Sequence, residues 1–335
     1  MDYYNNLKNI NSIKFDYRIK KSENIETVVQ NLEKNLLTNF SKEEVKVKEI
    51  HSDNSKNIQL LFDSEVKVKL INVFLGSGFS SNVLHFMQPN SNCLVIWHDG
   101  HGASAHLREN VIKKFIDTGC DVLAFAMPLS PGNNFPKNLG SCEISSHQSF
   151  SCLENNKDYY PLSLFFTPLK KAIDVALTNY SSAKDLKIFA VGLSGGGWTL
   201  AHYSAIDNRI DYTFLVSATI PYELRKFPHG LRDVLKKSQS NMGDWEQRNS
   251  RLISSFTLYD LALIHQIQQR NLTFLFIDND LCCFRSSMAK VMENKLTEIL
   301  KSDSNFIKFN YDKNSYAHDV TKAHMDFITS EISQY

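Results

Sequence analysis

A serine between spaced glycines is the part of the sequence best suited to do chemistry. Residues 188–198 read IFAVGLSGGGW, so Gly192, Ser194 and Gly196 form a Gly-x-Ser-x-Gly motif. An apolar stretch typical of a buried strand comes directly before the motif, and a helical pattern comes directly after it. Side chains two positions before and after the serine would collide in so tight a turn, which explains the glycines. The motif predicts a serine nucleophile.

A glycine-rich turn can also hold a phosphate group, but neither common phosphate-binding pattern fits. The lysine of Gly-x-x-x-x-Gly-Lys-Ser/Thr is missing, and Leu200 stands where the third glycine of Gly-x-Gly-x-x-Gly would be. A turn whose glycines serve only the backbone is the other alternative. Nucleophilic catalysis is the interpretation that the pattern favours.

The elements that must position this serine follow from the hydrophobic pattern. Residues 24–37 predict an amphipathic helix, and residues 45–88 alternate like antiparallel strands, including a stretch at 58–62. From Cys93 onward, short apolar segments alternate with helical ones, which is typical of parallel strands buried on both faces. The predicted strands are 94–97, 122–126, 188–191, 213–216, 273–277 and 306–310. The predicted helices are 103–118, 162–179, 197–205, 286–301 and 320–333. The fold class is therefore α/β, a mostly parallel, doubly wound sheet with antiparallel N-terminal strands.

Two connections are too long to be simple crossovers. They cover residues 128–161 and 221–271, and the second contains helical patterns of its own. Both emerge at the carboxyl edge of the sheet, where open α/β sheets bind ligands. We expect residues 1–44 to be an N-terminal extension with a helix, and residues 45–335 to be one domain with a helical cap inserted at about 221–271.

On this motif and this order of elements, residues 45–335 resemble the α/β-hydrolase superfamily, and its serine esterases in particular. The resemblance implies an α/β-hydrolase fold and a triad in the chain order serine, acid, histidine, with Ser194 as the nucleophile. The acid would lie just past the strand that follows the cap. Asp280 matches that position best, with Asp278 and Glu223 as alternatives. An aspartate that merely ends a strand is the other interpretation of each.

The resemblance also places the histidine and the oxyanion hole. His318 lies after the last predicted strand and before the last helix, whereas His324 falls inside that helix, where packing is the more common role. The oxyanion hole would use the N–H of Gly195 and one from residues 98–104, where His101 is expected and Ala103 is the alternative.

Two further clusters could carry chemistry. The histidines of the same loop, His98, His101 and His106, lack the His-Glu-x-x-His spacing, so we expect no metal and no organic cofactor. Residues 243–247 read GDWEQ, which could grip a sugar-like substrate or could simply start a helix capped by Asp244.

Composition excludes several classes of function. Of 335 residues, 37 are Lys or Arg and 36 are Asp or Glu, so the net charge of +1 makes nucleic acid a poor partner. No apolar stretch approaches the length of a membrane span, and the N-terminus lacks a secretory pattern, so a cytoplasmic location is expected. The cysteines are few, two are adjacent, and zinc spacing is missing, which suits free thiols in a reducing compartment. They are Cys93, Cys120, Cys142, Cys152, Cys282 and Cys283.

The expected activity is hydrolysis of a carboxylic ester, with a short acyl group on a small molecule or sugar as the substrate. Thioester or peptide hydrolysis and acyl transfer would use the same triad. A noncatalytic binding protein of the same fold is the alternative from another class. The sequence leaves the oligomeric state open.

Overall fold

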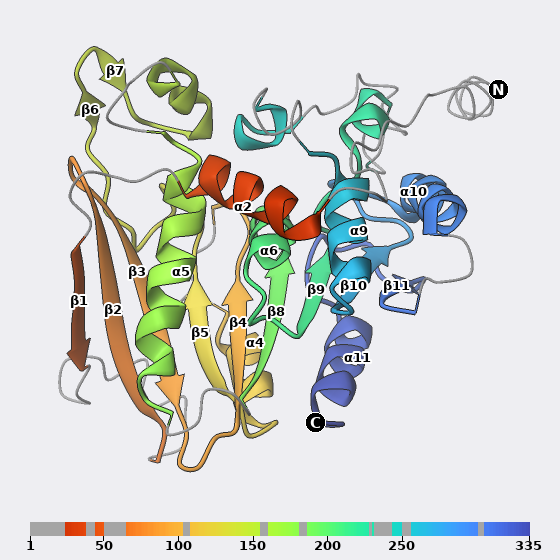
Figure 1. Cartoon of the computed structure of the whole chain (residues 1–335), viewed down its shortest axis with the longest axis horizontal. Helices are drawn as coiled ribbons and strands as arrows, with labels where there is room; N and C mark the ends of the chain where they lie inside the picture. Colours follow the sequence, from red (N-terminus) through yellow and green to blue (C-terminus); the bar gives the residue numbers. More distant parts are fainter. Residues whose placement is uncertain are drawn as a thin grey trace.

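The computed structural model describes residues 24–37, 44–49, 65–102, 108–154, 160–180, 186–227, 230, 243–249, 256–300 and 305–335. In these ranges one nine-stranded sheet has the order β1-β2-β3-β5-β4-β8-β9-β10-β11 (Figure 1). Its strands are β1 (Glu44–Glu49), β2 (Lys67–Gly76), β3 (Phe79–Met87), β4 (Cys93–His98), β5 (Asp121–Phe125), β8 (Lys187–Leu193), β9 (Tyr212–Val216), β10 (Asn271–Ile277) and β11 (Ile307–Asp312). A two-stranded ribbon, β6 (Asn138–Leu139) and β7 (Cys142–Glu143), lies apart from it.

The directions of the strands confirm the predicted fold class. The pairs β1–β2, β2–β3 and β3–β5 are antiparallel, and every pair from β5 to β11 is parallel. Each strand predicted after Cys93 is present within two residues of its expected ends. The stretch at 58–62 lies outside the described residues.

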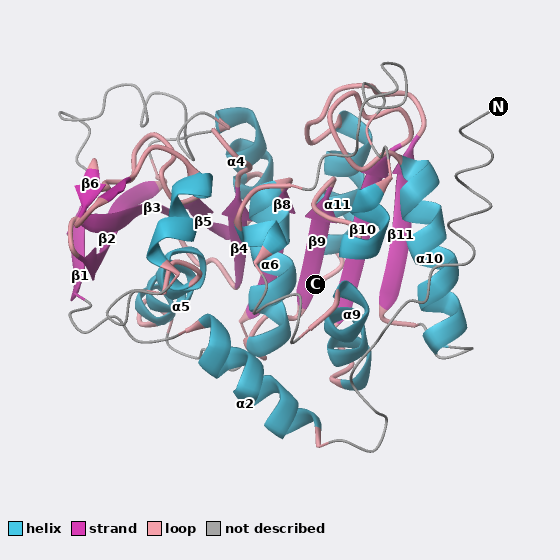
Figure 2. Cartoon of the chain, turned by 90° about the horizontal axis from the view of Figure 1, so that it is seen from above, coloured by secondary structure: helices cyan, strands magenta, loops and turns pink. Residues whose placement is uncertain are grey.

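Helices cover both faces of the sheet (Figure 2). They are α2 (Ile25–Leu36), α4 (Glu109–Ile116), α5 (Ser163–Leu177), α6 (Gly195–Ile206), α9 (Leu258–Ile267), α10 (Ser286–Leu300) and α11 (Lys322–Ile332). Side chains of α4 and α11 share one hydrophobic cluster, and those of α2, α5, α6, α9 and α10 share the cluster on the opposite face. All residues of β4 and β5 are buried, because both faces of these strands are covered. This explains the unbroken apolar runs that mark these strands in the sequence.

Two regions bear on the expected domain boundaries. In the N-terminal region, Leu32 and Leu36 of α2 are fully buried and belong to the main core. In the segment expected to be a cap, α9 packs on α6 and β10 and contributes to the same core. The helical pattern at 231–237 lies outside the described residues. No described helix is long and apolar enough to cross a membrane.

The cysteines correct one expectation. They form three disulfides, Cys93–Cys120, Cys142–Cys152 and Cys282–Cys283. The interpretation as free thiols was wrong because strand pairing and loop folding bring cysteines together that are 27 and 10 residues apart in the first two bridges. Paired cysteines no longer support a reducing compartment.

Candidate active site

Ser194 occupies a sharp turn between β8 and α6. Its φ of 51° and ψ of −120° lie in a region that residues with a Cβ rarely adopt. Its backbone N–H donates to the carbonyl of Val216 at 2.9 Å, and its carbonyl accepts from the N–H of Trp198 at 2.9 Å. The turn is thus held on one side by β9 and on the other by the first turn of α6.

The glycines of the motif are required by close backbone approach. A Cβ built on Gly192 would lie 2.6 Å from the Cα of Gly197, and one built on Gly196 would lie 2.2 Å from the carbonyl oxygen of His98. Both distances are well inside van der Waals contact. The glycine spacing in the sequence therefore indicates a turn whose backbone packs directly against neighbouring backbone atoms.

We expect Gly196→Ala to lower the free energy of unfolding by about 3 kcal/mol, because the backbone of the neighbouring loop must shift to admit the methyl group. Gly140→Ala is the matched control. Gly140 has a φ of 62°, but its added Cβ would meet nothing within 4 Å, so the cost is about 1 kcal/mol for the backbone conformation alone. Urea unfolding of both variants measures the difference in the free energy of unfolding. Equal losses in the two variants would show that the turn at Gly196 can accommodate a methyl group.

His318 and Asp280 lie in contact at the same edge of the sheet. His318 Nδ1 is 2.7 Å from Asp280 Oδ2, and the aspartate side chain is fully buried. Asp280 Oδ1 accepts from the backbone N–H groups of Cys282 and Cys283 at 2.8 and 3.0 Å. The N–H of Leu281 donates to the carbonyl of Tyr316 at 3.1 Å and ties the two loops together. The carboxylate is thereby fixed from two sides.

The structure separates the alternatives to Asp280 and His318. Asp278 makes no hydrogen bond with His318, and its backbone N–H pairs with Asp312 at 2.8 Å. Glu223 lies in η4 (Tyr222–Lys226) and lines a different pocket. His324 is buried in α11 with Nε2 3.3 Å from the carbonyl of Phe276, as expected for a packing residue.

Ser194 and His318 line one cavity of about 300 Å³. The buried Nε2 of His318 has no hydrogen-bond partner in the described part of the chain, so it can serve an incoming group. Charged and polar side chains make up half of the other lining residues. They include Asp99, His101, Arg108, Arg225, Asp244 and Gln247.

Two backbone segments near Ser194 could supply oxyanion donors. Gly195 is the first residue of α6, so its N–H has no acceptor within the helix. On the loop after β4, the N–H of Gly100 is already bonded to Asp99 Oδ1 at 2.7 Å. His101 is the next residue, and its ring lies directly against Gly195, where an added Cβ would be 2.4 Å from His101 Cε1. Ala103, the alternative donor, lies outside the described residues.

Two ion pairs made by Arg108, which the sequence did not predict, link the loop after β4 to the loop that carries His318. Arg108 Nε donates to the buried Asp99 at 3.1 Å, and Arg108 Nη1 donates to Asp319 at 2.5 Å. Asp319 is the neighbour of His318. Arg108 therefore couples the position of the loop after β4 to that of the histidine loop. His98 takes no part in these ion pairs. Burial lowers the pKa of its imidazole to about 4, so the ring is neutral at pH 7, and it stacks on Phe125.

The segment at 243–247 contributes both to the core and to the lining of the cavity. Trp245 is buried against Phe150 with 5.5 Å between ring centroids, and η5 (Glu246–Arg248) follows it. Glu246 contacts His101 and His147. Although burial raises the pKa of the Glu246 carboxyl, its hydrogen bonds with the two histidines outweigh this and bring the pKa to about 2. Asp244 is the member of this segment whose acid group lines the cavity with Ser194.

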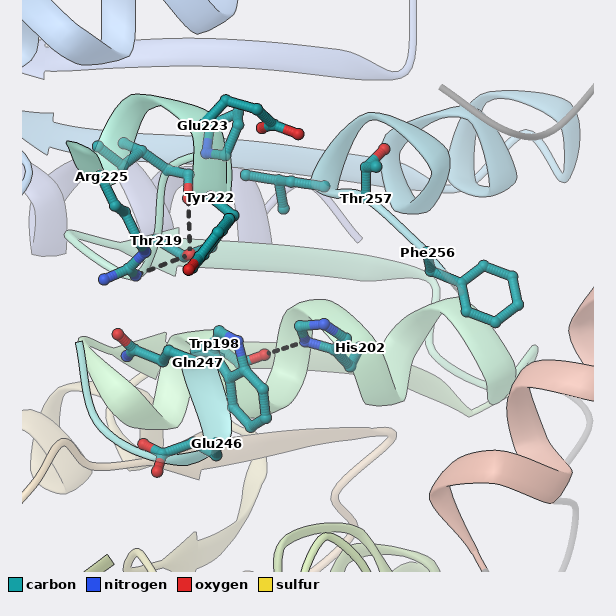
Figure 3. A pocket seen from close by; sticks show the side chains of 13 residues that line it. Trp198, His202, Thr219, Tyr222, Glu223, Arg225, Glu246, Gln247, Phe256 and Thr257 are labelled. Carbon is teal, nitrogen blue, oxygen red and sulfur yellow. Dashed lines mark hydrogen bonds between the residues drawn. The ribbon is translucent and has the colours of Figure 1, made fainter. Parts of the chain in front are cut away.

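A second, smaller pocket of about 50 Å³ adjoins the first, and Figure 3 shows its walls. Arg225 and Gln247 line both spaces. The buried Arg225 donates to Thr219 Oγ1 at 3.2 Å (Figure 3). Arg225 also lies over the ring of Phe284. Burial lowers the pKa of Arg225 to about 10, so the side chain is still a cation at neutral pH.

No protein-family model and no curated protein matches this sequence. Among solved structures, acetyl xylan esterase 1 from Thermoanaerobacterium sp. JW/SL YS485 is similar with a TM-score of 0.62 and 11% identity over 98% of each chain. The acetyl xylan esterase from Paenibacillus sp. R4 has a TM-score of 0.61 and 12% identity over 98% of this chain and 99% of that one. The glucuronoyl esterase from Solibacter usitatus has a TM-score of 0.54 and 10% identity over 94% and 93%. The chain has the α/β-hydrolase fold that these structures share.

Proposed function

We propose that this protein is a serine carboxylesterase in which Ser194 attacks the ester carbonyl, His318 accepts and returns the proton, and Asp280 orients His318. The observation that carries the proposal is the 2.7 Å contact between His318 and the buried Asp280, in loops that border the same cavity as Ser194. An acyl-enzyme forms, the alcohol leaves, and water then releases the acid.

The protonation states follow from the contacts of Asp280. A carboxylate oxygen can only accept, so His318 carries its proton on Nδ1, which leaves the lone pair on Nε2. A base in this state can take the proton of the serine hydroxyl. The imidazolium that results is stabilised by the charge of Asp280.

The developing negative charge on the ester oxygen needs donors that are already in place. The N–H of Gly195 at the start of α6 supplies one, and the N–H of His101 supplies the second. The hydrogen bond between Gly100 N–H and Asp99 supports this choice, because it leaves His101 as the next donor along the loop.

The substrate we propose carries a short acyl group on a small polar molecule or sugar. The charged and polar lining of the cavity supports a polar alcohol, and the similar solved structures include esterases of acetylated xylan by their names. Thioester or peptide hydrolysis and acyl transfer would use the same residues. A panel of short and long acyl esters, thioesters and acetylated sugars distinguishes these substrates by kcat/KM.

A fluorophosphonate probe should label the folded protein covalently at Ser194, because the probe requires an activated serine hydroxyl. Labelling is read by intact mass and by peptide mapping. Prior denaturation or Ser194→Ala should abolish it. A folded, unsubstituted chain that is not labelled would favour a noncatalytic binding protein of the same fold.

A further inference from the structure

Three side chains from distant segments converge beside the loop after β4. His101 follows β4, His147 is the first residue of η3 (His147–Leu153), and Glu246 is the first of η5. His101 Nε2 is 2.8 Å from Glu246 Oε1, and His147 Nδ1 is 3.1 Å from Glu246 Oε2. The two ring nitrogens are 3.2 Å apart. Two imidazoles and a carboxylate thus face one point.

The spacing suits ligands around a small divalent cation. Tetrahedral zinc, with bonds of about 2.0–2.1 Å, holds neighbouring ligand atoms about 3.3 Å apart. The separation between the two histidine nitrogens is within about 0.1 Å of that value, and each nitrogen also contacts one oxygen of the Glu246 carboxylate. Imidazole nitrogen and carboxylate oxygen are both ordinary zinc ligands.

The hydrogen bond on the far side of His147 fixes its tautomer. His147 Nε2 is 2.7 Å from the carbonyl oxygen of Pro128, an acceptor only, so Nε2 carries the proton. In the neutral ring the lone pair is then on Nδ1 and faces the carboxylate of Glu246. Two electron-rich atoms at 3.1 Å need either a metal ion or a second proton on His147 between them. A backbone carbonyl that orients a histidine in this way is a regular feature of metal sites.

The cluster is largely shielded from solvent. The side chain of Glu246 is fully buried, and that of His147 is 8% exposed. Asp244 Oδ2 lies 3.3 Å from His101 Nε2 at the more exposed side and adds a second negative charge nearby. Three protein ligands leave the fourth position of a tetrahedral zinc ion for water.

We propose that His101, His147 and Glu246 bind one divalent metal ion of the zinc class. The ion joins three segments and holds the ring of His101 against Gly195, so it positions the loop that borders the nucleophile. The sequence showed no metal pattern because His101 and His147 are 46 residues apart, and His147 and Glu246 are 99 apart. The proposal stands independently of the esterase activity.

Zinc binding is best measured on the Ser194→Ala chain, so that the result does not depend on turnover. After treatment with a chelator and dialysis, calorimetric titration with zinc sulfate should give one ion per chain. The Tm should rise by about 4 °C at a zinc concentration 100 times Kd. Glu246→Gln and His147→Gln should each weaken binding at least about 100-fold. Far-UV circular dichroism checks that both variants fold.

His318→Ala is the matched control. His318 belongs, with Cys282 and Cys283, to the other group of metal-type side chains in the described ranges, and its loss should leave zinc binding unchanged. Cobalt(II) in place of zinc should give the strong visible absorption of four-coordinate cobalt, which requires no variant. Absence of binding up to 1 mM zinc, a weak six-coordinate cobalt spectrum, or binding that persists in Glu246→Gln and His147→Gln would overturn the proposal and leave a proton-sharing cluster.

Discussion

Ser194→Ala is expected to lower kcat/KM for an ester substrate by about 10³-fold or more while leaving the Tm nearly unchanged. The hydroxyl supplies the bond to the acyl group, and no other described atom at the turn replaces it. Serine and alanine both carry a Cβ, so the strained φ of 51° costs the folded state about the same in each. The measurement is steady-state kinetics with thermal unfolding of the same samples.

Ser217→Ala is the matched control for this change. Ser217 follows β9, also has a positive φ of 41°, and is fully buried, but it does not line the cavity. Its hydroxyl has no hydrogen-bond partner in the described ranges, so its removal should change kcat/KM by no more than a few fold. Full activity of the Ser194→Ala protein would contradict the assignment of the nucleophile.

Asp280→Asn is expected to reduce kcat by up to about 10⁴-fold, the size of the corresponding change in serine proteases. The N–H groups of Cys282 and Cys283 donate to Oδ1, so an amide at this position keeps its oxygen there. Its NH₂ group then faces Nδ1 of His318 and donates to it. The proton of the ring moves to Nε2, where the base needs a lone pair.

Asp278→Asn tests the same idea at the neighbouring carboxylate. Because no hydrogen bond joins Asp278 to His318 in the described structure, its substitution should leave kcat within a few fold. Both variants are assayed at the same pH, with the Tm as a check on folding. A crippled Asp278→Asn enzyme would transfer the role of the acid to Asp278, and if neither variant loses activity, Glu223 becomes the residue to test.

Local patterns in the sequence predicted the frame of the site well. The strand before Ser194, the glycines around it and the helix after it are neighbours in the chain, so their spacing records the geometry directly. Asp280 and His318 could also be proposed from the sequence, because in a parallel sheet the loops after β10 and β11 lie at the same edge.

Contacts between distant segments could not be predicted in this way. Arg108 bonds Asp319 across 211 residues, and His101 contacts Glu246 across 145, so no spacing in the chain records either pair. The Cys93–Cys120 disulfide was missed for the same reason. Composition alone cannot tell a pair of free thiols from two sulfur atoms that a sheet brings together.

The Cys93–Cys120 bridge makes the durability of the fold depend on its chemical surroundings. It closes a loop of 27 residues that spans β4, the loop bearing His101, and α4. A crosslink of that span contributes about 3.5 kcal/mol by restricting the unfolded chain. This is a substantial part of the roughly 5–15 kcal/mol that keeps an ordinary domain folded. Reduction of this bridge would withdraw that contribution, so unfolding of the purified protein with and without a thiol reductant measures how much the bridge stabilises the fold.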